Sequence, residues 1–389
     1  MKGGFSPPDE CVTNITFGSR VQASWTLPHS YFYMATATTT STSRRLCREP
    51  LHILGAGSIG QLFAASIRSR FPSYPLTVLL RESHRHRWND DNRELKIEWI
   101  RPSNLVKPTS QSESVCVPIE YLLEDPNNNN LGPIQNLLVT TKSYQAVAAV
   151  ESVLSRMNTH NADSTTNSRI ILLCNGALSV KEELEALLLQ NRRPIQMVLA
   201  TTTHGAYREQ HEPSTQKLIH AGCGQTFIEE SAKDIGNLWN EAGLNCISLS
   251  SQAMQSLLWQ KLAANCVINP LTALYQCTNG ELLLEPNFPL LQAEILEEVS
   301  KVLAVLASNG DDTDNNCCEV NVNSLGNFVN QVIRDTSTNK SSMYQDIVHG
   351  HRTEIDHLNG YVVRKGRDLG IQCPANEDIV QRIKEKEKS

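Results

Sequence analysis

Three polar side chains interrupt an apolar segment, Leu257 to Pro270, at regular spacing. Lys261, Asn265 and Asn269 are each four residues apart, so in an α-helix they lie on one face. An ammonium among apolar residues is unfavourable unless neighbouring groups satisfy it. A cation beside two carboxamides suits carbonyl reduction, because it can stabilise an oxyanion and deliver a proton to it. We therefore expect a catalytic face on a buried helix; the alternative for Lys261 alone is a surface lysine whose stem packs along the helix.

A glycine-rich turn provides the second chemical pattern. The apolar strand expected at 51–54 leads into G-x-G-x-x-G, which comprises Gly55, Ala56, Gly57, Ser58, Ile59 and Gly60. A helical pattern follows, and a second strand at 76–80 completes a β-α-β unit. In that context the glycines permit a tight turn, close approach to a pyrophosphate and close helix packing, while the helix N-terminus attracts phosphate. These six residues are therefore predicted to bind a dinucleotide; the weaker alternative is a glycine-rich turn without a ligand.

The end of the second strand bears on the choice between NAD and NADP. An NAD site usually has an acidic residue there for the ribose 2′-hydroxyl, whereas this chain has Arg81. A guanidinium suits a 2′-phosphate through charge-assisted hydrogen bonds, and Arg85 and Arg87 add positive charge nearby. We therefore expect NADPH/NADP+ as the cofactor. The expectation weakens if Glu82, and not Arg81, faces the ribose.

Two further polar residues follow expected central strands. Lys142 comes directly after the strand 137–141, and Asn175 directly after the strand 170–174. Ligands of open α/β sheets bind at the carboxyl ends of the strands, so both residues are predicted to line the cofactor site. On position alone, a surface lysine at the start of a helix is an equal alternative for Lys142.

Composition and charge exclude several classes of protein. The 389 residues are 40% hydrophobic and 20% charged, with a net charge of −6. These values are typical of a globular protein and argue against a nucleic-acid binder. No apolar run reaches the ~18 residues of a membrane-spanning helix. The eleven cysteines are scattered without a C-x-x-C pair, so neither a disulfide framework nor a metal site is expected.

The chain is long enough for two domains. Residues 1–48 are predicted to be a disordered extension or, if translation began at Met34, a transit segment. Residues 49–250 are predicted to form an NADP-binding Rossmann-type domain, and residues 251–389 an all-helical substrate and catalytic domain. The expected fold class is therefore α/β with an additional helical domain. We expect a cytoplasmic protein, with a mitochondrial location as the alternative.

Four segments together resemble the ketopantoate reductases, the 2-dehydropantoate 2-reductases. They are residues 54–61, residues 261–273 with 279–281, residues 341–346 and residues 353–360. The run K-L-x-x-N-x-x-x-N-P, which starts at Lys261, is far more specific than the glycine pattern. The resemblance implies an N-terminal Rossmann domain, a C-terminal helical domain and an active site in the cleft between them. It also implies the reduction of ketopantoate to pantoate with NADPH, a step of pantothenate and coenzyme A synthesis.

The resemblance implies roles for individual residues as well. Lys261 is the catalytic lysine, and Glu354 is the active-site glutamate, either a counter-charge for Lys261 or an acceptor for the substrate hydroxyl. We expect Glu354 to lie in a helix that begins near Thr353. The implied substrate-binding residues are Asn265, Asn269, Asn279 and Ser342, and the implied cofactor contacts are Arg81, Lys142 and Asn175.

Two alternative functions stay open on the sequence. One is the reduction of another branched 2-oxo acid, and the other is NADPH sensing without turnover. The expected partner is a small 2-oxo acid, with neither nucleic acid nor a membrane involved. The expected assembly is a monomer or a homodimer.

Overall fold

The structure, a computed structural model, describes residues 46–81, 94–100, 112–122, 132–157, 168–210, 216–308 and 321–388. The extension predicted for residues 1–48 lies almost entirely outside these ranges, as do Glu82, Arg85 and Arg87. Within the described ranges, no helix combines the length and the apolar character that crossing a membrane requires.

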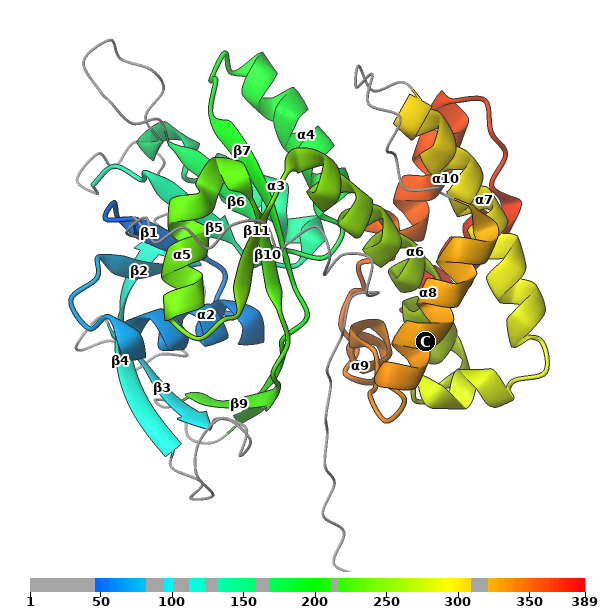
Figure 1. The fold of residues 1–389 in the computed structure, drawn as a ribbon, viewed down its shortest axis with the longest axis horizontal. Coiled ribbons are helices and arrows are strands. Elements are labelled where there is room, and N and C mark those ends of the chain that lie inside the picture. The colour runs from blue at the N-terminus through cyan, green and yellow to red at the C-terminus, as the bar shows by residue number, and fades with distance from the viewer. Residues whose placement is uncertain are drawn as a thin grey trace, which may run out of the picture.

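A sheet of eleven strands occupies the N-terminal half of the described chain (Figure 1). In chain order the strands are β1 (Leu51–Leu54), β2 (Leu76–Arg81), β3 (Glu94–Ile100), β4 (Ser112–Leu122), β5 (Asn136–Val139), β6 (Arg169–Leu172), β7 (Gln196–Thr202), β8 (Gly205–Gln210), β9 (Gln216–Gly222), β10 (Thr226–Glu229) and β11 (Cys246–Leu249). Their order in the sheet is β11-β10-β7-β6-β5-β1-β2-β4-β3-β9-β8. The central strands β2, β1, β5, β6 and β7 are parallel, so their carboxyl ends meet at one edge.

Helices cover both faces of the central strands, which explains why those strands are short, apolar and buried. One face packs against α2 (Ser58–Arg70) and α5 (Lys233–Glu241), where Phe63 and Trp239 meet edge to face with ring centroids 5.0 Å apart. The other face packs against α3 (Ser143–Glu151) and α4 (Ala177–Gln190). The short 3-10 helices η2 (Leu154–Arg156) and η3 (Glu230–Ala232) lie in the connections.

From residue 251 onward the described chain is helical, as expected. The elements are α6 (Ser251–Tyr275), η4 (Gly280–Leu284), α7 (Phe288–Ser308), α8 (Val322–Asp335), α9 (Ser342–Val348), η5 (Ile355–His357), α10 (Asn359–Asp368) and α11 (Pro374–Lys386). The change from sheet to helices falls between the end of β11 at Leu249 and the start of α6 at Ser251. Ser250 caps α6, because its side chain accepts a hydrogen bond from the Ala253 N–H at 3.3 Å.

One long helix, α6, joins the two halves of the molecule (Figure 1). Its N-terminal part contacts β7, β10 and β11, and its C-terminal part packs against α7, α8, α9 and α11. Buried α6 residues such as Leu258, Val267 and Leu271 belong to one continuous apolar core with α3, α4 and the C-terminal helices. The two domains therefore share a core that runs along α6.

The expectation that Glu354 lies in a helix starting near Thr353 is wrong. Glu354 precedes the 3-10 helix η5, and the α-helix begins only at Asn359. Contacts across the domain boundary explain the difference. A Cβ on Gly176, which has φ +64°, would lie 2.8 Å from His357 Cβ, so η5 packs directly on that backbone, and tertiary packing outweighs helical propensity.

The glycine-rich turn joins β1 to α2, and there is little free space around Gly55 and Gly60. A Cβ on Gly60 would lie 2.0 Å from Gly55 O and 2.6 Å from Thr140 Oγ1. At Gly57, by contrast, the nearest atom to a Cβ would be Thr140 O at 4.0 Å. Gly60 is therefore required by the packing of the chain itself, whereas Gly57 leaves open space at the N-terminus of α2.

We predict that Gly60→Ala mainly lowers stability, whereas Gly57→Ala mainly weakens dinucleotide binding. Gly60→Ala should lower the free energy of unfolding by about 3 kcal/mol or more, because the methyl group overpacks against backbone. Gly57→Ala should change stability by less than about 1 kcal/mol but weaken dinucleotide binding, because the methyl group occupies the open space. Urea denaturation and titration with NADPH measure the two effects. Equal loss of stability in both variants would contradict this division.

Candidate active site

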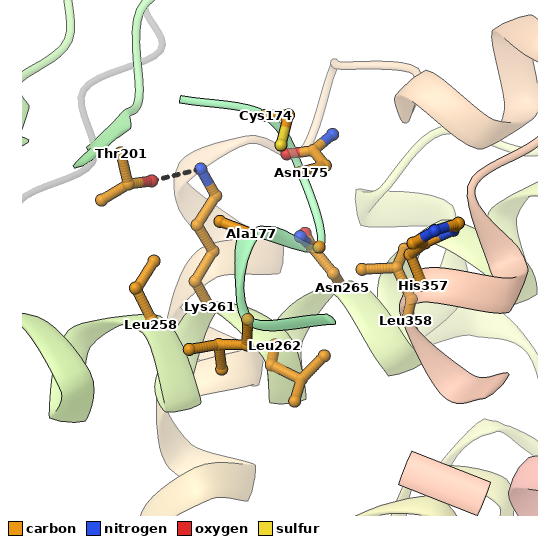
Figure 2. Close-up of a pocket in the computed structure, with 12 residues that line it drawn as sticks. Cys174, Asn175, Ala177, Thr201, Leu258, Lys261, Leu262, Asn265, His357 and Leu358 are labelled. Carbon is orange, nitrogen blue, oxygen red and sulfur yellow. Dashed lines mark hydrogen bonds between the residues drawn. The ribbon is translucent and has the colours of Figure 1, made fainter. Parts of the chain in front are cut away.

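Lys261 reaches from α6 to the end of strand β7 (Figure 2). Its Nζ donates a hydrogen bond to Thr201 Oγ1 at 2.5 Å and another to Thr202 O at 3.2 Å. Thr201 and Thr202 are the last two residues of β7, at the edge where the parallel strands end. The side chain expected to be catalytic thus belongs to the helical domain, while its hydrogen-bond acceptors belong to the sheet.

The surroundings of Lys261 disfavour its charge. Its side chain is half-buried and its ammonium lies between the domains, where burial lowers its pKa to about 8. Attraction to Cys174 and Glu354 opposes this shift without cancelling it. The ammonium therefore holds its proton at neutral pH but releases it more readily than an ordinary lysine does.

A pocket surrounds this ammonium. It is formed by α6, the end of β7, the segment from β6 into α4, and the residues around η5 (Figure 2). Lys261 and Asn265 point from α6 toward the segment that carries Cys174 and Asn175. The lining residues are Cys174, Asn175, Gly176, Ala177, Leu178, Thr201, Leu258, Lys261, Leu262, Asn265, His357 and Leu358.

The structure brings three of the residues expected in the site to this pocket. Lys261, Asn265 and Asn175 line it, whereas its described lining does not include Asn269, Asn279 or Ser342. Asn269 and Asn279 are 8% and 6% exposed.

The partners of those three residues show how they are held. Asn279 Nδ2 donates to Thr336 Oγ1 at 2.8 Å. Ser342 begins α9, directly after the N-cap Ser341. The Ser341 hydroxyl lies 3.5 Å from Asn269 O. Ser341, which precedes Ser342 in the chain, therefore connects the start of α9 to the backbone of Asn269.

Glu354 joins the two domains through contacts with the Rossmann domain. Its Oε1 accepts a hydrogen bond from the Ser143 N–H at 2.8 Å, and its Oε2 accepts one from Asn175 Nδ2 at 3.2 Å. Lys142 Nζ lies 3.8 Å from Glu354 Oε2 and donates to Asp346 Oδ2 at 2.7 Å. Because Ser143 is the first residue of α3, the carboxylate also lies at the positive end of a helix.

Two roles were expected for Glu354, and one of them was a direct counter-charge for Lys261. The described contacts show no ion pair between these two side chains. Glu354 pairs instead with Lys142, and it acts on Lys261 only through space by favouring the charged form. Lys142 stays charged: burial disfavours its cation, but Glu354 and Asp346 outweigh burial and raise its pKa. Burial also raises the pKa of Asp346, although Lys142 attracts its charged form.

The glycine-rich turn and Arg81 lie at the carboxyl ends of two neighbouring parallel strands, β1 and β2. Gly57 is the N-cap of α2, and none of the described side chains caps this end, so its N–H groups are available to a phosphate. A hydrogen bond fixes the turn to the segment after β5, because Thr140 Oγ1 donates to Gly55 O at 2.8 Å. Arg81 is exposed at the end of β2. Open space at Gly57, uncapped N–H groups and an exposed cation at the end of the neighbouring strand fit a phosphorylated dinucleotide.

No group of three or more metal-ligating side chains occurs among the residues that the structure describes. Among the polar groups in the pocket are the ammonium of Lys261 and the amides of Asn175 and Asn265, and the carboxylate of Glu354 accepts from Asn175.

Sequence reasoning missed the residues that hold the charged groups. Thr201 and Thr202 end a strand, so the rule that places Lys142 and Asn175 at the ligand edge of the sheet applies to them too. Asp346 lies within one of the four family-like segments but was assigned no role. Nothing in the sequence pairs it with a lysine 204 positions away.

Two family models together match most of the chain. A family model described as "Ketopantoate reductase PanE/ApbA" matches residues 51–233, and one described as "Ketopantoate reductase PanE/ApbA C terminal" matches residues 253–387. A 2-dehydropantoate 2-reductase of Vibrio cholerae serotype O1 is 36% identical over 259 residues, 65% of this chain and 78% of that protein. The 2-dehydropantoate 2-reductase of Escherichia coli O157:H7 is 31% identical over 340 residues, 86% of this chain and 94% of that protein.

Solved structures share the two-domain fold. A PanE/ApbA family ketopantoate reductase from Ralstonia eutropha JMP134 has a TM-score of 0.66 and 21% identity, covering 87% of this chain and 99% of that one. D-mandelate dehydrogenase in complex with NADH and anilino(oxo)acetate has a TM-score of 0.66 and 19% identity, covering 87% and 98%. At these identities the likeness concerns the fold alone.

Proposed function

Because this chain belongs to the ketopantoate reductase family, we propose that it reduces 2-dehydropantoate (ketopantoate) to (R)-pantoate with NADPH. This reaction is a step of pantothenate and hence coenzyme A synthesis. One observation carries the proposal above the others. The Lys261 ammonium, buried between the domains, lines a pocket at the carboxyl ends of the strands together with Asn175 and Asn265.

In the proposed reaction, Lys261 acts as the proton donor. Addition of hydride to a ketone leaves negative charge on the carbonyl oxygen, and a buried ammonium stabilises that charge more strongly than an exposed one. Its pKa of about 8 suits transfer of a proton at neutral pH. Thr201 and Thr202 orient the ammonium until the substrate oxygen replaces one of them as the acceptor.

The remaining polar residues hold the substrate and close the site. Asn265 lies one turn from Lys261 in the pocket, where its amide can hydrogen-bond the carbonyl region. Asn269, Asn279 and Ser342 extend the site along α6 toward α9, and Ser342 donates to the carboxylate of the 2-oxo acid. Glu354 holds the domains together through Ser143 and Asn175 and accepts from the product hydroxyl.

The cofactor site combines the turn from Gly55 to Gly60 with Arg81, Lys142 and Asn175. Free N–H groups at the start of α2 would hold the pyrophosphate. Arg81 would hold the 2′-phosphate, which NADPH carries and NADH lacks. When bound, the nicotinamide supplies the hydride. Lys142, held by Asp346 and Glu354, lies at the same sheet edge.

The alternatives predict different results in one assay. Purified protein is mixed with NADPH or NADH and with ketopantoate or other branched 2-oxo acids, and the loss of reduced-cofactor absorbance is recorded. We expect the highest kcat/KM with NADPH and ketopantoate, because Arg81 and the pocket residues match that pair. A higher value with another acid would select the second reductase function. NADPH binding without turnover of any acid would select the sensing function.

The proton donor is tested by Lys261→Ala. We expect kcat to fall by about 10²–10⁴-fold, as for loss of a general acid and oxyanion donor, with the Kd for NADPH nearly unchanged. Lys301→Ala, on the exposed side of α7, serves as the matched control and should leave kcat unchanged. A Lys261→Ala variant that kept more than a tenth of the activity would remove Lys261 from the mechanism.

The lowered pKa of Lys261 makes a prediction about pH. A proton donor must be protonated in the free enzyme, so kcat/KM for reduction should be constant below pH 8 and should fall as the pH rises through about 8. Glu354→Gln should move this falling limb to lower pH, because Glu354 favours the charged form of Lys261. A pH profile that stayed flat through this range would rule out Lys261 as the donor.

A further inference from the structure

Pro270 leaves a backbone carbonyl of α6 without its helical donor. In an α-helix each N–H donates to the carbonyl four residues earlier, and proline has no N–H. The carbonyl affected is that of Cys266, the residue next to Asn265. Cys266 is 0% exposed, and a buried carbonyl without a partner is unfavourable.

Asn359, the first residue of α10, supplies the missing donor from another element. Its Nδ2 donates to Cys266 O at 2.9 Å and to Asn376 Oδ1 at 3.0 Å. Both hydrogens of this amide nitrogen are used, and the side chain is 0% exposed. The Asn359 side chain therefore stands in for the N–H that Pro270 lacks.

A buried carboxylate sets the orientation of the Asn359 amide. Glu298, on α7, accepts from the Ala375 N–H at 2.8 Å, the Asn376 N–H at 2.9 Å and Asn376 Nδ2 at 2.7 Å. Because both Glu298 oxygens accept from N–H groups, Asn376 must turn its nitrogen toward Glu298 and its oxygen toward Asn359. Asn359 in turn must present its nitrogen to Asn376, which also directs this nitrogen at Cys266 O.

The segment that carries Ser342 is hydrogen-bonded to the same part of α6. Thr272 Oγ1 lies 2.7 Å from Ile268 O and 2.6 Å from Ser341 Oγ. Ser341 in turn caps α9, because its hydroxyl accepts from the Tyr344 N–H at 3.0 Å. Two separate segments of the helical domain are therefore attached to α6 within about one turn of Pro270.

We propose that Asn359 is a positioning residue of the active site. It acts through Cys266 O, and it joins the proline-interrupted turn of α6 to the segment that carries Glu354, five residues before it in the chain. Through this bond the Lys261–Asn265 face of α6 and the carboxylate of Glu354 keep a fixed separation. The kinetic part of this inference rests on the proposed function.

The experiment is a double-mutant cycle of Asn359→Ala with Pro270→Ala. Alanine at position 270 restores the helical N–H, so Cys266 O no longer needs Asn359. We expect Asn359→Ala alone to lower kcat/KM for ketopantoate at least about tenfold, as misplacement of reacting groups does, with the Kd for NADPH within about twofold. In the Pro270→Ala background the same change should lower kcat/KM less than about threefold, a coupling expected only of groups that share a partner.

A control separates positioning from simple loss of stability. Val329→Ala removes buried volume from α8 (Val329 is 0% exposed) and should lower the urea midpoint while leaving kcat/KM unchanged. Equal kcat/KM losses in Asn359→Ala and Val329→Ala, or an equal effect of Asn359→Ala in both backgrounds, would overturn the proposal. If Asn359→Ala does not fold, recovery of folded protein by Pro270→Ala supports the proposal, and no recovery overturns it. If the wild-type protein does not turn over ketopantoate, the proposed function fails, and the coupling is measured from urea midpoints alone.

Discussion

A lysine ammonium buried between two domains is the constraint on which the rest of the structure depends. Its charge is unfavourable there unless acceptors surround it, and its acceptors, Thr201 and Thr202, belong to the other domain. The site is therefore complete only when both domains pack together. The apolar core that runs along α6 from the sheet to the C-terminal helices provides the free energy for that packing.

Polar contacts set the alignment of the two domains at the edges of this core. On one side Lys142 and Ser143 meet Asp346 and Glu354. On the other side α10 meets α4, where Lys365 Nζ lies 2.8 Å from Glu182 Oε2. Pairs that are partly exposed contribute little to stability, but two separate sets of directional contacts limit rotation about α6.

The sequence was most informative where chemistry depends on local spacing. The glycine-rich turn, the parallel strands and the change to helices after residue 250 follow from local patterns, and Lys261 and Asn265 do face the pocket together. Asn269 does not line it, although it continues the interval of four residues. At 3.6 residues per turn, an interval of four drifts by about 40°, so two intervals rotate Asn269 by about 80° from Lys261. Two such intervals therefore place Asn269 off the line that joins Lys261 and Asn265 along α6.

Contacts between distant segments could not be predicted in the same way. Glu354 was a natural partner for Lys261 by charge alone, yet the fold places Lys142 and the N-terminus of α3 beside it. The 3-10 turn at η5 likewise reflects close packing of His357 on Gly176. In each case the sequence contains a pattern typical of a helix or of an ion pair. The packing of one domain on the other determines which residues actually come into contact.

Pro270 shows why such local departures are informative. A proline within a helix loses a hydrogen bond and is unfavourable by about 3 kcal/mol or more, and here it interrupts a helix that is otherwise apolar and well packed. Sequences tend to break local rules at functional positions and to compensate for them elsewhere. The compensation is visible in Asn359, Asn376 and Glu298, which together replace one missing N–H with an oriented buried network. Because that replacement comes from the segment that follows Glu354, the interruption in α6 connects elements that a regular helix would leave independent.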